Sequence, residues 1–163
     1  MVSFATPGGG VGPHFDHYDV FLIQGEGKRL WQLGEACDCN TPIDKSSQLN
    51  LLSDFSVREE FILEKGDALY IHPHISHNGI ALTDSLCFSV GFRAPSVYEM
   101  SPQFNGNKKE SNNPFHRFKN SDSPDKQKYR WEIRESDLEE AFKISSHEDF
   151  EGFVRLFGTC LLY

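Results

Sequence analysis

Long apolar runs are missing from this sequence of 163 residues. The longest, such as Val20 to Ile23, are far too short to cross a bilayer, and there is no charged-then-apolar leader with a small-residue cleavage site. The hydrophobic fraction of 38% is low for a globular protein, but fourteen Phe supply large apolar surfaces. We expect a soluble, cytoplasmic domain with one aromatic-rich core and no membrane partner.

Basic residues are also scarce, since 16 Lys and Arg against 24 Asp and Glu leave a net charge of -8. This acidity argues against direct binding to nucleic acid and favours a neutral or basic partner. Only four cysteines occur, and without an export signal we expect reduced thiols. Cys37 and Cys39 could open a zinc site, but no second Cys or His pair lies at the required spacing, so we interpret them as loop residues.

Short apolar runs separated by glycine-containing turns fill the N-terminal part of the chain. We expect strands at Val2 to Ala5, Val20 to Gln24, Arg29 to Leu33, Glu60 to Leu63, Ala68 to Ile71 and Leu86 to Phe92. Many short strands with turn signals between them predict a mainly β fold of the sandwich or barrel type.

The composition changes after this β-rich part. Residues 101–130 are polar and predict a linker or loop, and residues 131–163 predict a short C-terminal α-helical region. Ser136 and Ser146 each stand three residues before a carboxylate, which predicts two helix starts. An apolar helix face follows, formed by Phe150, Phe153, Val154 and Phe157. This face could pack on the chain's own barrel or form a homodimer through the C-terminal helices.

Both ends of the sequence are abrupt. A strand is expected from the first residues onward, and the chain closes on the apolar residues Leu161, Leu162 and Tyr163. We therefore expect a chain that is truncated at both ends, with a barrel at residues 1–100 followed by the linker and the start of a possible dimerisation domain.

A candidate metal site lies in the run His14-Phe15-Asp16. In a β-strand alternate side chains face the same way, so His14 and Asp16 would project together and supply two donors of a facial triad for non-haem iron. His77 is the favoured third donor because a glycine turn, an apolar strand and Pro73 precede it. His72 and His74 compete for this role, and the alternative for the first pair is an ordinary surface His-x-Asp.

The order of these residues resembles the JmjC-type ribosomal oxygenases, which are protein hydroxylases with a cupin fold, also called a double-stranded β-helix or jelly roll. The resemblance rests on the pattern His14-x-Asp16-x-x-Asp19-Val20-Phe21-x-x-Gln24-x-x-Gly27-x-Arg29-x-Trp31. Later segments extend it from Val2 to Pro95, including His77-x-Gly79 and the run from Ser89 to Pro95. The glycine-rich approach before His14, and Arg29 where eukaryotic-type relatives carry Lys, look most like the bacterial ribosomal-protein arginine hydroxylases.

The resemblance implies that His14, Asp16 and His77 bind Fe(II) and that Arg29 binds the far carboxylate of the cosubstrate 2-oxoglutarate. A guanidinium offers a rigid fork that suits a carboxylate. Ser89 could donate a hydrogen bond to the same carboxylate, or could simply line the barrel. The chain departs from the family pattern at two other positions, where His74 replaces the usual Gly and Cys87 replaces a polar lining residue.

The function implied is an Fe(II)- and 2-oxoglutarate-dependent oxygenase that hydroxylates an arginine side chain on a large-subunit ribosomal protein. Tyr18 and Gln24 are candidates for the substrate pocket. Two alternatives stay open from the residues. One is a metal-dependent cupin enzyme that acts on a small molecule without 2-oxoglutarate, and the other is an inactive or non-catalytic cupin binding module.

Overall fold

A computed structural model of the chain describes residues 1–46, 49–93, 135–145 and 149–152. Its contacts divide the chain into two compact units, Met1–Arg93 and Ala94–Tyr163. The described part of the first unit is built from strands, and that of the second is helical. The expected linker at residues 101–130 lies outside the described residues.

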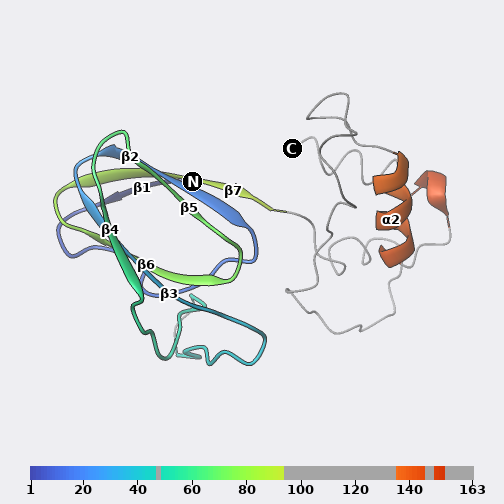
Figure 1. The fold of residues 1–163 in the computed structure, drawn as a ribbon, viewed down its shortest axis with the longest axis horizontal. Coiled ribbons are helices and arrows are strands. Elements are labelled where there is room, and N and C mark those ends of the chain that lie inside the picture. The colour runs from blue at the N-terminus through green and yellow to red at the C-terminus, as the bar shows by residue number, and fades with distance from the viewer. Residues whose placement is uncertain (47–48, 94–134, 146–148, 153–163) are drawn as a thin grey trace. The chain divides into compact units, whose positions relative to one another are not determined.

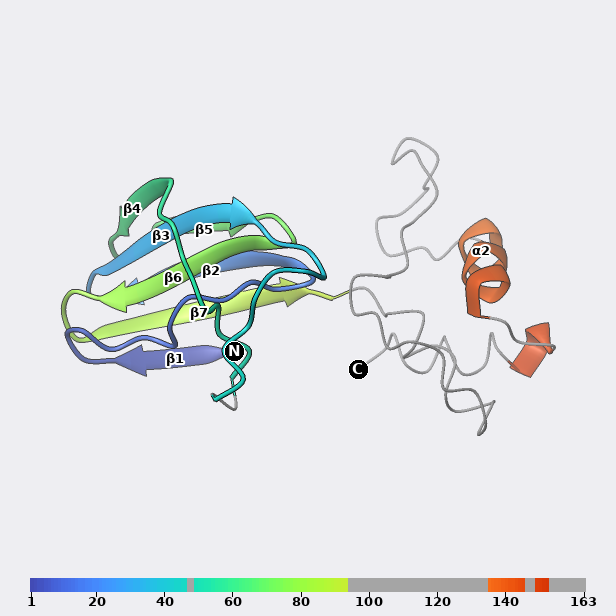
Figure 2. The same ribbon diagram turned by 90° about the horizontal axis from the view of Figure 1, so that it is seen from below.

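The strands of the first unit form two antiparallel sheets that face each other (Figures 1 and 2). The larger sheet has the order β1-β7-β2-β5 and the smaller one the order β4-β3-β6. The strands are β1 (Val2–Ala5), β2 (Asp19–Glu26), β3 (Arg29–Ala36), β4 (Glu59–Leu63), β5 (Ala68–Ile71), β6 (Ile75–Ala81) and β7 (Ser85–Phe92). Mainly β architecture of the cupin type is thus confirmed.

The alternation of side chains along the strands places the core between the two sheets. Val20 and Leu22 of β2 face inward, and their neighbours Phe21 and Ile23 face outward. The inner cluster is completed by Trp31 of β3 and by Leu63, Ile71 and Cys87 of β4, β5 and β7. The smaller sheet therefore packs on the inner face of the larger one, and the buried side chains of both sheets lie between them.

Most expected strands are present, but one strand was missed and the strand expected at His14 and Asp16 is wrong. Strand β6 was not expected, although it carries His77. His14 and Asp16 do not lie in a regular strand, because His14 forms only an isolated bridge, with His77, and the segment turns before β2 begins. Tight turns occur at Gly27 and Gly66, whose φ angles of 68° and 95° lie in the left-handed region that glycine tolerates.

Helix α2 (Glu135–Ser145) is the longest helix described in the second unit. The expected cap at Ser136 is wrong, because α2 begins one residue earlier and Ser136 lies in its first turn. The negative charges of Glu135 and Asp137 in the first turn interact favourably with the positive N-terminal end of the helix dipole. The positive charge of Lys143 in the last turn does the same at the negative C-terminal end. The expected start at Ser146 and the apolar positions after Gly152 lie outside the described residues. No helix in the described ranges is long and apolar enough to cross a membrane.

Candidate metal centre

A glycine-rich segment brings the first two candidate ligands to β6. The Gly8 amide donates a hydrogen bond to the Ala81 carbonyl at 2.8 Å, and the Ala81 amide donates one to the Gly9 carbonyl at 2.9 Å. A Cβ atom on Gly10 would lie 2.2 Å from the Gly79 carbonyl oxygen, so only glycine fits this approach. The segment therefore runs beside β6 like an additional strand, and it delivers the chain to His14.

His14 and His77 are joined directly through their backbones. The His14 amide donates to the His77 carbonyl at 3.0 Å, and the His77 amide donates back at 2.8 Å. The two rings lie 4.4 Å apart between centroids. Asp16 is anchored separately, because its carbonyl accepts a hydrogen bond of 2.7 Å from the His74 amide. Residues far apart in the sequence are thus fixed next to each other by main-chain bonds.

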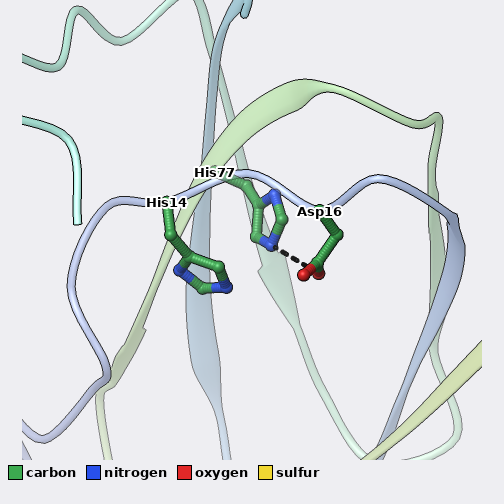
Figure 3. Close-up of side chains that lie close together, drawn as sticks. All are labelled: His14, Asp16 and His77. Carbon is green, nitrogen blue, oxygen red and sulfur yellow. Dashed lines mark ion pairs between the residues drawn. The ribbon is translucent and has the colours of Figure 1, made fainter. Parts of the chain in front are cut away.

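The side chains of His14, Asp16 and His77 converge on one space (Figure 3). One donor atom from each residue lies within 4.8 Å of the other two, and His77 Nε2 is 3.8 Å from Asp16 Oδ2. Donors around one divalent ion, each at about 2.1 Å, would sit roughly 3 to 4 Å apart. The three side chains therefore need only a small contraction to share an ion.

Hydrogen bonds set the state of both imidazoles. His14 Nδ1 lies 2.8 Å from the Gly12 carbonyl, and His77 Nδ1 lies 2.9 Å from the Ile75 carbonyl. Because a carbonyl oxygen can only accept, each Nδ1 carries a proton, and in a neutral ring this leaves Nε2 with a free lone pair. Burial, and secondarily the neighbouring His14, lowers the pKa of His77, so this ring is neutral at neutral pH. The neutral His77 ring and the Asp16 carboxylate therefore do not form an ion pair, and the two facing atoms, Nε2 and Oδ2, are both free to bind a metal ion.

Arg29 lies in the wall of the same cavity, which has a volume of about 530 Å³ and also contains the three converging side chains. Its guanidinium is buried and is held by hydroxyl groups, since Nη2 and Nε donate to Ser85 Oγ at 2.9 and 3.2 Å, and Nη1 donates to Ser3 Oγ at 3.0 Å. Within the described ranges no carboxylate forms an ion pair with it. A buried charge without a counter-charge is costly, so this position suits an anionic ligand.

The other expected site residues are distributed unevenly. Tyr18 and Ser89 line the cavity, and Tyr18 packs closely on Gly91 of β7. Gln24 is buried in β2, is not part of the cavity wall, and donates a hydrogen bond to the Glu26 carbonyl. His72 is exposed, whereas His74 supports Asp16 through its backbone.

Sequence reasoning missed the two hydroxyls that hold the guanidinium. Ser3 and Ser85 stand 26 and 56 residues away from Arg29 in the sequence. A serine in a short strand carries no local signal of such a role. The strand order was needed to find them.

Comparison with known proteins gives consistent matches for this chain. Residues 1–100 match the JmjC domain family. The ribosomal protein uL16 3-hydroxylase of Escherichia coli (strain K12) is 45% identical over 104 residues, which make up 64% of this chain and 28% of that protein. The chain therefore spans less than a third of this curated relative.

Two solved structures from Escherichia coli are similar over most of the chain. The X-ray structure of ycfD has a TM-score of 0.61 and 32% identity, and the match covers 96% of this chain and 42% of that one. The structure of YcfD as a ribosomal oxygenase in complex with cobalt and succinic acid has a TM-score of 0.52 and 30% identity, with 94% and 40% covered.

Proposed function

The chain belongs to the JmjC domain family, and from this premise we propose that it is an iron(II)- and 2-oxoglutarate-dependent protein hydroxylase. The observation that carries the proposal is the cavity in which His14, Asp16 and His77 converge while Arg29 lines the wall. A set of metal donors and a carboxylate anchor in one cavity is what this chemistry requires.

We assign the metal to His14 Nε2, His77 Nε2 and one oxygen of Asp16. The donor set fits iron(II), because two neutral imidazoles and one carboxylate form a facial triad that leaves positions open for other ligands. The backbone carbonyls of Gly12 and Ile75 keep both rings in the binding tautomer. When bound, iron(II) and 2-oxoglutarate supply the dioxygen chemistry that inserts one oxygen atom into a C–H bond and yields succinate and carbon dioxide.

Arg29 would anchor the far carboxylate of 2-oxoglutarate. The guanidinium can offer a rigid pair of N–H donors, and the hydroxyls of Ser3 and Ser85 fix its orientation before the ligand arrives. The relative solved with cobalt and succinic acid, a dicarboxylic acid, supports a site of this kind. Ser89 in the same cavity wall is proposed as a further donor to the cosubstrate.

The substrate proposed is an arginine side chain of a large-subunit ribosomal protein. The name of the uL16 3-hydroxylase relative supports a ribosomal protein, and the net charge of -8 would attract a basic partner. Such a substrate would make the site of action cytoplasmic. Tyr18 in the cavity wall is the better candidate for a substrate contact, because Gln24 lies away from the wall.

The proposal is tested with the 163-residue chain supplied with iron(II), 2-oxoglutarate and peptides from ribosomal proteins. Mass spectrometry should detect the gain of one oxygen atom on an arginine-containing peptide and not on the matched peptide in which lysine replaces that arginine. Succinate should form in step with the product. Equal succinate from His14→Ala and from the unaltered chain would contradict the proposal.

A further inference from the structure

Trp31 lies beside the path that joins the candidate metal ligands to Arg29. Along β3, Trp31 comes two residues after Arg29 and is paired with Gly79 of β6, which in turn comes two residues after His77. Residues two apart in a strand face the same way and stand about 6.6 Å apart, so the Trp31–Gly79 pair is halfway between the other two. The centroid of the Trp31 ring is 5.9 Å from Arg29 Cζ and 6.2 Å from the centroid of the His77 ring. A ligand that joins the metal to Arg29 therefore has to pass this ring.

The ring of Trp31 cannot retreat toward the smaller sheet. Gly79 has no side chain, and a Cβ atom built on it would lie only 2.6 Å from both Cζ3 and Cη2 of the indole. The ring thus lies directly on the backbone of β6. Trp31 is also buried, and close-packed side chains in a protein interior do not shift without cost. The indole is therefore a rigid part of the cavity wall.

The facing wall of this part of the cavity is apolar as well. Leu22 of β2 and Cys87 of β7 line the same cavity from the larger sheet, are buried, and belong to the same core cluster as Trp31. A polar group without a hydrogen-bond partner is costly in such surroundings, whereas methylene groups are not. The stretch beside Trp31 therefore suits the aliphatic middle of a ligand whose two ends are polar.

Both ends of this stretch are held in place. His77 is fixed by its two backbone hydrogen bonds to His14, and the guanidinium of Arg29 is fixed by two serine hydroxyls. An extended acid with one additional methylene group is longer by about 1.3 Å, and neither end can move to make room for it. Such an acid has to bend sideways, and the indole of Trp31 occupies that side.

We infer that Trp31 sets the length of the dicarboxylic 2-oxo acid that the site accepts. This role rests on the proposed function, because it takes the metal and Arg29 as the two ends of the binding site. The five-carbon acid 2-oxoglutarate lies extended along the indole, whereas the six-carbon acid 2-oxoadipate must bend into it. One methylene group too many in an apolar pocket weakens binding about 10- to 200-fold, so we expect at least a tenfold preference for 2-oxoglutarate.

Calorimetric titration of the full chain with each acid, in the presence of zinc(II), tests this role. The quantity compared is the ratio of the two affinities within one variant, because a partial loss of folded protein affects both acids alike. Trp31→Phe replaces the indole by a smaller ring, and the preference for 2-oxoglutarate should fall at least about fivefold. Ile71→Val is the matched control, because Ile71 belongs to the same core cluster and is outside the cavity wall. Its preference should equal that of the unaltered chain.

The possible results separate this role from the proposed function. An unaltered chain that binds neither acid would overturn the proposed function and, with it, the role of Trp31. An unaltered chain that binds both acids equally well would overturn the role of Trp31 alone. The same holds if 2-oxoglutarate is preferred and Trp31→Phe keeps the full preference.

Nuclear magnetic resonance of the zinc(II) complex gives a second test that leaves Trp31 unaltered. The sequence has two tryptophans, so in Trp131→Phe every tryptophan ring signal comes from Trp31. We expect nuclear Overhauser effects between these ring protons and the methylene protons of bound 2-oxoglutarate. Acid that binds without such effects would lie elsewhere in the cavity and would refute the inference.

Discussion

Replacement of Arg29 by methionine should separate cosubstrate binding from folding stability. The methionine side chain would preserve the aliphatic stem and remove the guanidinium, whose donors are held by Ser3 and Ser85. Two charge-assisted hydrogen bonds to a carboxylate contribute about 1.5 to 3 kcal/mol each, from which ordering of the ligand subtracts part. A net loss of about 3 to 4 kcal/mol corresponds to a weakening of 2-oxoglutarate binding by roughly 200- to 1,000-fold.

Folding stability should hardly change in the same variant. Arg29 is only 6% exposed and has no carboxylate partner within the described ranges, so the free chain carries the desolvation cost of a buried charge. Removing this cost offsets the loss of the hydrogen bonds to the two serines. We expect the free energy of unfolding to stay within about 1 kcal/mol of that of the unaltered chain.

Calorimetric titration with 2-oxoglutarate, in the presence of a divalent metal ion that does not support catalysis, measures the cosubstrate affinity. Urea unfolding measures the free energy of unfolding. Arg29→Lys keeps the positive charge but loses the planar pair of N–H donors, and should bind 2-oxoglutarate about 10- to 30-fold more weakly than the unaltered chain. Lys28→Met is the matched control, because the Lys28 ammonium is exposed and pairs with Glu64. Undiminished 2-oxoglutarate affinity in Arg29→Met would refute the anchor role and favour a metal enzyme that works without this cosubstrate.

Further predictions concern packing and titration in the first unit. Gly79→Ala should lower the melting temperature, because its Cβ would lie 2.6 Å from the ring of Trp31, and overpacking of this kind costs about 1 to 3 kcal/mol in thermal unfolding. The hydrogen bond to Asp19 raises the pKa of Tyr70, so an ultraviolet titration of Asp19→Asn should show a phenol that ionises at lower pH than in the unaltered chain. Since the folded chain holds this proton more tightly, stability should fall as the pH rises above the ordinary value of 10.0, and less steeply in Asp19→Asn; no difference would contradict the contact. Burial raises the pKa of Cys87, so its thiol should react with maleimide far more slowly in the folded chain than in urea, and equal rates would contradict its burial.

The sequence was sufficient for most strands and insufficient for one of them. Strands β1 and β5 have the expected bounds, because their apolar runs are short and end at glycine or proline-containing turns. Strand β6 escaped detection because, after Ile75, its inward positions are His77, Gly79 and Ala81, a candidate ligand and two small residues. A strand that lines a cavity does not show the alternation of large apolar residues on which strand prediction depends.

The candidate site could also be predicted only in part, because contacts between residues far apart in the sequence hold it together. The order of His14, Asp16, Arg29 and His77 pointed to a family, and the structure brings these side chains to one cavity. The sequence predicted that a regular strand projects His14 and Asp16 together, whereas the bridge to His77 and the hydrogen bond from the His74 amide hold them in place. The serines around Arg29 depended on strand pairing that no local pattern encodes.

Titration of the chain with cobalt(II), followed by X-ray absorption at the cobalt edge, tests most directly whether three residues share one metal ion. We expect one tightly bound ion per chain, coordinated by two imidazole nitrogens and a carboxylate oxygen at about 2.0 to 2.2 Å. His77→Ala should lose this ion, while His72→Ala, at an exposed position outside the cavity wall, should retain it. Cobalt that binds equally well to His77→Ala, with an unchanged spectrum, would contradict the shared metal centre.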